Sequence, residues 1–481
     1  MDVLSNQYLS LGKQFYQRSL PCKAPAPSTL LFNNALAEQI GFSTSLIGNA
    51  NLQAKLFSGT ELFAESEPLA LAYAGHQFGQ LNPQLGDGRA HLLGEITSST
   101  GTVTELQLKG SGQTPFSRGG DGKCALGPAI REYLMSEALH GLGIATTRTL
   151  AVVTTGETVW RDQPRPGAIV TRTAQSHIRV GSLQYFAIRG DYDSIRALAD
   201  IAIDRHYPHI NKQDDDYLLQ FLNAVIDKQI ALIVSWLRVG FIHGVMNTDN
   251  SLLSGETIDY GPCAMMGAYH PGTVYSSIDH QGRYAFGNQA AIGQWNMARL
   301  AETLLALVSD DSDKAIEQVK PILFAYSDKF QRAYQDMLAN KLGFTEQSDE
   351  SRSLAEQLLN IMQENGLDYT QTFITLSQVL AGDTALRQLD ASLCDWCKTW
   401  QAAISNTDNA LALMAKSNPL VIPRNHHVEA LIEQSYQTNS TAQIDKFLAV
   451  VTRPYQATAD IALYQDLPSD GDKGYQTFCG T

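Results

Sequence analysis

The segment 243–261 constrains the fold of this chain more than any other stretch. It begins His-Gly-Val-Met-Asn-Thr-Asp-Asn and ends Asp-Tyr-Gly. Asp249, Asn250 and Asp259 therefore lie within eleven residues, on either side of 251–254, whose composition is compatible with a short strand. Carboxylate and amide oxygens are the ligands that a hard divalent cation takes. The segment thus predicts a Mg²⁺ site on Asn250 and Asp259.

The order of these residues is similar to that of a protein kinase, whose catalytic loop ends in a metal-binding Asn and is followed by a metal-binding Asp-Phe-Gly. One position departs from this pattern. The kinase catalytic Asp stands two residues after the loop histidine, and here that position is Val245, which cannot accept a proton. Asp249 is the only acid near the place of an attacking hydroxyl, and a positioned carboxylate can act as a general base. The structural alternatives are that Asp249 merely supports the metal ligands and that His243 is a core histidine.

Composition and charge exclude several functional classes. The 481 residues carry a formal net charge of −14, so no general basic surface is available for nucleic acid. Six cysteines in so long a chain do not form a disulfide scaffold. The N-terminal sequence lacks the charged and apolar regions of a signal peptide, and the longest apolar run, 230–237, is too short to cross a bilayer. We therefore expect a cytoplasmic protein without a membrane or nucleic-acid partner.

Residues 72–182 are predicted to be rich in strands. Alternating or β-branched runs followed by glycine-containing turns predict strands over 90–96, 103–109, 149–155 and 167–172.

A single helix is expected between these two pairs of strands, with Pro128 in its first turn and a glycine at its end. Lys109 ends the second strand, and Glu132 lies off the buried stripe of the helix. The two can therefore pair as the strand lysine and helix glutamate of a kinase do. Glu137 is the rival partner, but it lies about 140° further round the helix, at ~100° per residue. Taken alone, Lys109 is equally compatible with an exposed strand-end lysine.

Two glycine-rich turns, 86–89 and 110–122, accompany the strands. Glycine lets backbone N–H groups approach phosphate oxygens closely. Neither turn forms a Walker motif or Gly-x-Gly-x-x-Gly, so on composition alone both are ordinary turns. Arg172 and Arg179 follow, seven residues apart. Arginines neutralise a triphosphate well, although surface salt bridges are their commoner use.

The rest of the chain is predicted to be mainly helical. Residues 1–60 are interpreted as an irregular lead-in with one short helix near 34–40. Further helices are expected over 194–205, 217–239 and 290–308, with several more between residues 311 and 450.

Several reactive side chains lie outside the regions described so far. Cys394 and Cys397 form a C-x-x-C pair in a helical region without a second pair, so we interpret them as structural thiols. His426 and His427 are interpreted as surface or capping residues. Cys479 lies in a polar tail near the C-terminus, where an exposed thiol can exchange with another cysteine.

Seven longer motifs carry a further signal, and all of them lie between about residues 70 and 300. They are Tyr73-Ala-Gly-His-Gln-Phe-Gly, Leu106-Gln-Leu-Lys-Gly-Ser-Gly, Thr114-Pro-Phe-Ser-Arg, Ile130-Arg-Glu-Tyr-Leu-Met-Ser-Glu-Ala, His243-Gly-Val-Met-Asn-Thr-Asp-Asn, Asp259-Tyr-Gly-Pro and Asp279-His-Gln-Gly-Arg-Tyr. Together they are highly specific, and through them the chain resembles the selenoprotein O family. The resemblance implies an α+β, protein-kinase-like fold of two lobes: a β-rich N-lobe and a large helical C-lobe with a C-terminal helical extension. It also implies an enzyme that binds ATP in a flipped orientation and transfers AMP to protein hydroxyls.

The resemblance assigns roles to particular residues of this chain. Lys109 would hold phosphates and pair with Glu132, Asp249 would accept the proton, and Asn250 and Asp259 would bind Mg²⁺, or Mn²⁺ in its place. The remaining residues implied in the nucleotide site are Gly86, Gly88, Arg89, Asp121, Gly122, Arg172 and Arg179.

Five regions are expected along the chain: a lead-in over 1–70, the nucleotide-binding N-lobe over 71–188, the C-lobe core with the metal and catalytic loop over 189–310, a helical extension over 311–450 and a tail over 451–481. Transfer of AMP from ATP to Ser, Thr or Tyr hydroxyls is the favoured activity. The alternatives are transfer of UMP with Mn²⁺, a protein kinase with an unusual base, and a non-catalytic nucleotide-binding scaffold.

The C-terminal tail departs from the family pattern. Members often end in a Cys-x-x-Cys or Cys-x-x-selenocysteine tail, whereas here only Cys479 remains. A redox switch would therefore need a distant partner, for which Cys263 and Cys124 are the candidates.

Overall fold

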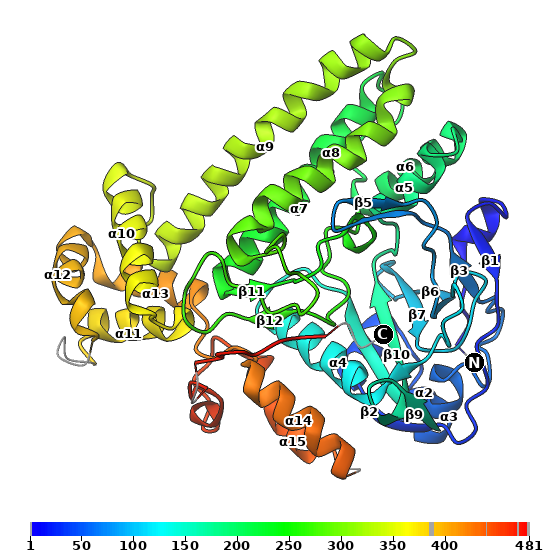
Figure 1. Ribbon diagram of the computed structural model, residues 1–481, viewed down its shortest axis with the longest axis horizontal. Coiled ribbons are helices and arrows are strands. Elements are labelled where there is room, and N and C mark those ends of the chain that lie inside the picture. Colours follow the sequence, from blue (N-terminus) through cyan, green and yellow to red (C-terminus); the bar gives the residue numbers. More distant parts are fainter. Residues whose placement is uncertain (1, 384–388, 439, 469–470, 479–481) are drawn as a thin grey trace.

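The computed structural model describes residues 2–383, 389–438, 440–468 and 471–478. It combines an eight-stranded antiparallel sheet with a larger helical part (Figure 1). The predicted combination of a strand-rich region with a long helical one is confirmed. Cys479 lies outside the described residues.

The sheet has the strand order β1-β3-β6-β7-β10-β9-β2, with β8 paired to β10. Its strands are β1 (Tyr16–Arg18), β2 (Ser28–Phe32), β3 (Leu69–Leu71), β6 (Ala90–Thr97), β7 (Val103–Lys109), β8 (Cys124–Ala125), β9 (Arg148–Trp160) and β10 (Pro164–Ala174). The four predicted strands are confirmed as β6, β7, β9 and β10.

The expectation of an irregular lead-in over 1–60 was wrong. The structure places β1 and β2 at the two ends of the sheet, where β1 pairs with β3 and β2 with β9. The predicted helix is α1 (Asn34–Ile40), and α2 (Thr44–Ile47) and α3 (Ala50–Phe57) follow it. These short strands adopt extended backbone because partners distant in sequence supply their hydrogen bonds, a contribution that local composition does not carry.

Helices cover both faces of the sheet, as the period-two alternation of its strands requires. Leu106, Leu108 and Ile169 face α1–α3. Val152 and Val170 face the opposite side and pack against α4 (Leu126–Gly141). The sheet therefore fixes the position of α4, the helix that carries Glu132 and Glu137, the two candidate partners of Lys109.

The helical part is built around three long helices that run side by side, α7, α8 and α9 (Figure 1). Its first helices are α5 (Val180–Ala187), α6 (Tyr192–His206), α7 (Tyr217–Val239), α8 (Gln289–Val308) and α9 (Ser312–Lys341), which confirms the predictions for α6, α7 and α8. By length and composition α7 could cross a membrane, but 56% of its most apolar window is buried inside the protein, and core helices pass the same test.

The later helices form two groups. Those at the far end of α9 are α10 (Asp349–Asn365), α11 (Tyr369–Ala381), α12 (Cys394–Ala403) and α13 (Thr407–Ser417). The last two, α14 (Asn425–Gln437) and α15 (Ala442–Val451), pack against α4. The remaining short elements are β4 (Gly75–Gln77), β5 (Gln80–Asn82), β11 (Phe241–Ile242), β12 (Ala264–Met265) and the 3-10 helices η1 (Gln7–Ser10), η2 (Thr248–Asn250), η3 (Phe286–Asn288), η5 (Ala391–Leu393) and η6 (Ile461–Tyr464).

Candidate active site

One cavity of about 530 Å³ collects residues from the strand-rich part of the chain and from the segment that follows α7. It is lined by eleven of the twelve residues singled out in the sequence: Gly86, Gly88, Arg89, Lys109, Asp121, Gly122, Arg172, Arg179, Asp249, Asn250 and Asp259. The twelfth, Glu132, lies directly behind Lys109. Residues separated by up to 173 positions are therefore brought to one place.

Four charged side chains form an ion-paired cluster at the back of this cavity. Lys109 Nζ donates to Glu132 Oε2 and to Asp259 Oδ1, both at 2.7 Å. Arg172 Nη2 donates to Glu132 Oε2 at 3.2 Å and to Asp259 Oδ1 at 3.0 Å. Two cations and two acids thus share one buried site, in which each charge is paired twice.

The pairing shifts the pKa values of the two acids. Burial alone would raise the pKa of Glu132, but the charges of Arg172 and Lys109 outweigh it and hold that pKa below its ordinary value. Burial opposes the same charges at Asp259, where Lys109 and Arg172 hold the pKa well below its ordinary value. Both carboxyls are therefore ionised at neutral pH.

Glu137, the rival partner for Lys109, has a different function. Arg148 Nε donates to its Oε1 at 2.6 Å, and Asn33 Nδ2 donates to its Oε2 at 2.7 Å. The two glutamates point in different directions from the helix. Glu132 therefore lies at the cavity wall with Lys109, whereas Glu137 contacts Arg148 of β9.

Asp249 is buried beside the cavity and has one oxygen without a partner. Burial raises the pKa of its carboxyl to about 6, against the charge of Arg179, which lowers it. Gln77 Nε2 lies 3.4 Å from Oδ2, whereas Oδ1 has no hydrogen-bond partner among the described residues. A buried carboxylate with a free oxygen and a pKa near neutrality can accept a proton from an incoming donor.

The loop that carries Asp249 is held by the Tyr73-Ala-Gly-His-Gln-Phe-Gly motif, for which the sequence suggested no role. The His76 N–H donates to Thr248 Oγ1 at 2.7 Å, and the Phe78 N–H donates to Asn247 Oδ1 at 3.2 Å. A Cβ on Gly75 would lie 2.4 Å from Asp249 Oδ1. Only glycine permits this approach of the β4–β5 hairpin to η2.

The two predicted metal ligands also lie on the cavity wall. Asn250 Nδ2 donates to the Val245 carbonyl at 3.0 Å, which fixes the amide and orients its Oδ1, the only atom of that group able to bind a cation. Asp259 has a positive φ of 72°, a conformation unusual for a residue other than glycine. An amide oxygen and an ionised carboxylate on one wall fit the oxygen chemistry of Mg²⁺ or Mn²⁺.

Two expectations for the 243–261 segment have clear outcomes. The prediction of a strand over 251–254 was wrong. Within this segment only Leu252 forms an isolated bridge, with Arg179, because the chain turns there instead of extending. The structural alternative for His243 fits the structure, since its ring is buried and its Nε2 contacts the Ile258 carbonyl at 2.9 Å.

The glycine-rich turns pack against one another above the cavity. A Cβ on Gly86 would lie 2.3 Å from the ring of Phe116, which belongs to the second turn. Asp121 lines the cavity, but its carboxylate is bound by Arg161 at 2.9 and 3.1 Å. Arg161 was missed in the sequence, because nothing near it along the chain marks the tip of the β9–β10 hairpin as part of a site.

Arg179 is held by two residues that sequence reasoning also missed. Its guanidinium lies 4.2 Å from the ring centroid of Tyr73 and 3.5 Å from Asp87 Oδ1. Asp87 is buried and also accepts a hydrogen bond from Gln107 at 3.0 Å. The Arg179 side chain is thereby fixed toward the cavity.

The charge of the cavity is opposite to that of the chain. Seven basic and four acidic side chains line it, although the chain as a whole carries a net charge of −14. A basic concave surface with fixed guanidinium groups attracts polyphosphates.

The cysteines considered for a redox switch are buried. Burial raises the pKa of the Cys263 thiol to about 12 and also raises that of Cys124. Neither of them forms a disulfide among the described residues. Buried thiols with raised pKa values react slowly in exchange.

A basic cavity, paired oxygen ligands and a buried carboxylate of raised pKa define an enzyme that acts on a polyphosphate. The family described as "Protein adenylyltransferase SelO" matches residues 3–452. A protein of Teredinibacter turnerae named "Protein nucleotidyltransferase YdiU" is 48% identical over 483 residues, which cover 99% of this chain and 100% of that protein. A protein of the same name from Pseudoalteromonas translucida is 49% identical over 478 residues, which cover 99% and 100%. The chain belongs to the SelO family, and it is a nucleotidyltransferase.

Proposed function

We propose that this enzyme transfers AMP from ATP to Ser, Thr or Tyr hydroxyls of proteins and releases pyrophosphate. The observation that carries the proposal is the position of Asp249. Asp249 lines a basic phosphate cavity and its Oδ1 has no hydrogen-bond partner among the described residues, while Val245, at the place of the kinase base, has no proton acceptor. The carboxylate that can take a proton is therefore displaced from the position that serves transfer of a γ-phosphoryl group.

In this reaction the substrate hydroxyl attacks the α-phosphorus of ATP, and its proton passes to Asp249. The new bond joins the hydroxyl oxygen to the α-phosphorus, while the bond from that phosphorus to the bridging oxygen breaks and pyrophosphate leaves. Lys109, Arg172 and Arg179 neutralise phosphate charge from fixed positions, which is the main means by which phosphate-transfer enzymes stabilise their transition states. Mg²⁺ held by Asn250 and Asp259 would add to this charge neutralisation.

The geometry also supports a kinase-like division of the chain into two lobes. The sheet with α4 carries the Lys109–Glu132 pair, and the segment after α7 carries Asp249, Asn250 and Asp259. We propose the boundaries given above, 1–70, 71–188, 189–310, 311–450 and 451–481, with the first region supplying β1 and β2 to the sheet of the second and the nucleotide between the second and third regions. We also propose that the enzyme works in the cytoplasm on protein substrates.

Labelled ATP tests the proposal. A protein substrate incubated with the enzyme and Mg²⁺ should acquire label from the α-phosphate and none from the γ-phosphate. Intact-mass measurement should show the addition of AMP. Label from the γ-phosphate alone would establish a kinase and reject nucleotidyl transfer.

The remaining alternatives are separated by two further measurements. Competition between ATP and UTP, each with Mg²⁺ and with Mn²⁺, distinguishes AMP from UMP transfer. A non-catalytic scaffold would bind ATP and keep its cellular function in an Asp249→Ala variant, whereas an enzyme would bind ATP and lose that function.

A further inference from the structure

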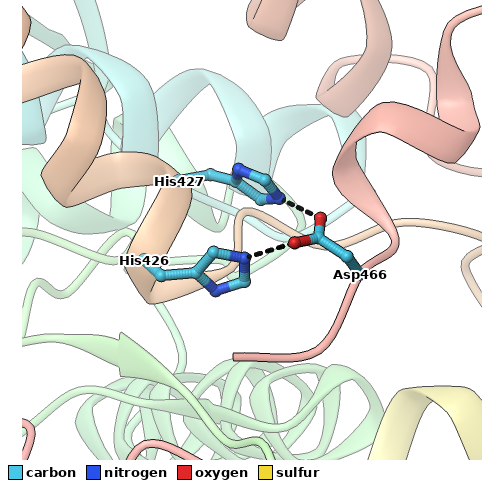
Figure 2. A group of neighbouring side chains, drawn as sticks. All are labelled: His426, His427 and Asp466. Carbon is cyan, nitrogen blue, oxygen red and sulfur yellow. Dashed lines mark hydrogen bonds and ion pairs between the residues drawn. The ribbon is translucent and has the colours of Figure 1, made fainter. Parts of the chain in front are cut away.

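Three side chains outside the nucleotide cavity form a second cluster with the chemistry of metal ligands. His426 and His427 lie in the first turn of α14, and Asp466 lies just beyond η6 in the tail. One ligand atom of each lies within 4.8 Å of the other two. Figure 2 shows both imidazole rings turned toward the same carboxylate.

We propose that His426, His427 and Asp466 bind one divalent transition-metal ion of the Zn²⁺ class. This site is separate from the oxygen ligands of the nucleotide cavity, and nucleotidyl transfer does not require it. His427 and Asp466 are 39 positions apart in sequence, so a bound ion would crosslink α14 to the tail.

Two of the distances between ligand atoms are close to those that a bound ion requires. His427 Nε2 lies 2.7 Å from Asp466 Oδ1, and His426 Nε2 lies 3.3 Å from Asp466 Oδ2. Ligand atoms at 2.0–2.2 Å from a tetrahedral Zn²⁺ are about 3.3 Å apart. One contact therefore already has this separation, and the other needs to open by about 0.6 Å.

The donor set selects the class of ion. Imidazole nitrogens suit Zn²⁺, Co²⁺, Ni²⁺ and Cu²⁺, whereas Mg²⁺ takes oxygen ligands. Two histidines and one carboxylate supply three ligands of a tetrahedral site and leave the fourth to water. Water can reach it, because the side chain of Asp466 is 59% exposed.

The two rings have the arrangement that a shared ion requires. Side chains at adjacent helix positions diverge by ~100°, yet the centroids of these rings are only 4.1 Å apart. His426 Nδ1 has no hydrogen-bond partner among the described residues, so Nδ1 is free to carry the ring proton when Nε2 binds an ion.

One feature opposes the ion. The first turn of α14 carries partial positive charge from its free N–H groups, which disfavours a cation. The Asp466 carboxylate offsets this charge. We therefore expect an affinity weaker than that of a fully enclosed structural zinc site.

A bound ion would strengthen the attachment of a segment that continues to the nucleotide cavity. Beyond Asp466 the tail reaches Tyr475, whose hydroxyl donates to Glu429 Oε1 of α14 at 2.7 Å. Thr477 Oγ1 then donates at 2.7 Å to the carbonyl of Pro262, a residue of the cavity wall. The site therefore lies at the start of the path that brings the tail to the active site.

Cobalt binding tests the proposal on the full-length protein, after chelator treatment and without nucleotide. Four- or five-coordinate Co²⁺ absorbs visible light far more strongly than aqueous Co²⁺. We expect one equivalent of such Co²⁺ in the native chain, displaced by Zn²⁺ and not by excess Mg²⁺. His427→Gln and Asp466→Asn should each weaken binding by at least about tenfold, and Zn²⁺ should raise the Tm of the native chain only.

Matched variants distinguish this site from the others. Asn250→Ala changes the nucleotide cavity and should leave the cobalt signal intact, and far-ultraviolet circular dichroism confirms that the His427→Gln and Asp466→Asn chains fold. Equal cobalt signals in the native and His427→Gln chains, or no signal at all, would overturn the proposal. A thiolate charge-transfer band would place the ion on cysteine and would overturn it as well.

Discussion

The side-chain amide of Gln77 lies against the carboxylate of Asp249, with 3.4 Å between Nε2 and Oδ2. The other oxygen, Oδ1, is buried and has no hydrogen-bond partner among the described residues. The amide therefore holds one oxygen of the proposed base and fixes the orientation of its carboxylate at the cavity wall. This relationship gives the Tyr73–Gly79 motif a positioning function.

Replacing Gln77 tests this function. The hydrogen bond from Gln77 lowers the pKa of Asp249, so Gln77→Leu should raise it and leave less of the ionised base at a given pH. We expect kcat to fall several-fold at pH 7, with the acid limb of the pH–rate profile shifted to higher pH and KM for ATP little changed. Gln80→Leu, in the neighbouring strand β5 of the same hairpin, should leave the profile unchanged. A uniform loss of kcat at all pH values would contradict the prediction.

The pKa of Asp249 itself predicts how activity depends on pH. With a pKa of about 6, the active ionised form is lost on acidification, and the rate should fall tenfold per pH unit well below 6. Asp249→Asn should lower kcat by about 10²–10⁴-fold and keep ATP binding. Single-turnover transfer from α-labelled ATP measures the first quantity, and equilibrium binding measures the second. An unchanged rate in this variant would remove Asp249 from the mechanism.

The same carboxylate should destabilise the fold at neutral pH. Its pKa rises from 3.8 to about 6 on folding, which corresponds to about 3 kcal/mol against folding once the group is ionised. This penalty is absent below pH 3.8 and complete above about pH 6, so stability declines as pH rises through that window. Asp249→Asn should therefore raise the free energy of unfolding by about 1–3 kcal/mol at pH 8 and by little at pH 4. Asp215→Asn, an exposed control, should change neither value.

Gly75→Ala tests the closeness of the hairpin to the base without changing any charge. The added Cβ would lie 2.4 Å from Asp249 Oδ1 and 2.7 Å from Leu85 Cδ1. Asp249 must move, and a displacement of this kind costs on the order of 10²-fold in rate. Gly48→Ala is the control, because its Cβ would have only an ordinary contact at 3.4 Å and its φ is −85°. Equal rates in both variants would contradict the prediction.

The extent to which the sequence predicted the fold follows from the range of the interactions involved. Strands β6 and β7 and helices α6, α7 and α8 could be predicted from their hydrophobic periodicity and from the turn residues beside them, which are local signals. The strands β1 and β2 are too short for such a signal, and their extended state depends on pairing with Leu71 and Ala151. The prediction of a strand over 251–254 was wrong for the converse reason. Its composition suits a strand, but only Leu252 has a bridge partner.

The residues of the candidate site also differ in whether local sequence could identify them. Charged residues in motifs, such as Lys109 and Asp259, could be singled out because their chemistry limits what they do. Gln77 and Asp87 could not be, because their roles consist of contacts with Asp249 and Arg179, residues distant in sequence. The convergence of His426 with Asp466 is also a product of tertiary packing, since adjacent histidines on a helix carry no metal signature of their own.

The two glutamates of α4 allow the last prediction, which separates a structural ion pair from one that serves the nucleotide. Both are buried and both are paired with arginine, but Glu132 also holds Lys109 at the cavity, whereas Glu137 holds Arg148 and Asn33. Glu132→Gln and Glu137→Gln should each lower stability, by up to about 3–5 kcal/mol, since each removes a buried acid from its ion pair: Arg172 is left with Asp259 alone, and the half-buried Arg148 loses its acid.

Only Glu132→Gln should also weaken ATP binding, because Lys109 loses the partner that fixes it and turns to Asp259 alone. Denaturant unfolding measures the common effect, and ATP titration at a temperature where both variants are folded measures the difference. If Glu137→Gln lost ATP affinity as well, the effect would come from general loosening of α4. Retained affinity in Glu137→Gln, together with loss in Glu132→Gln, would show that the Lys109–Glu132 pair acts on the phosphates directly.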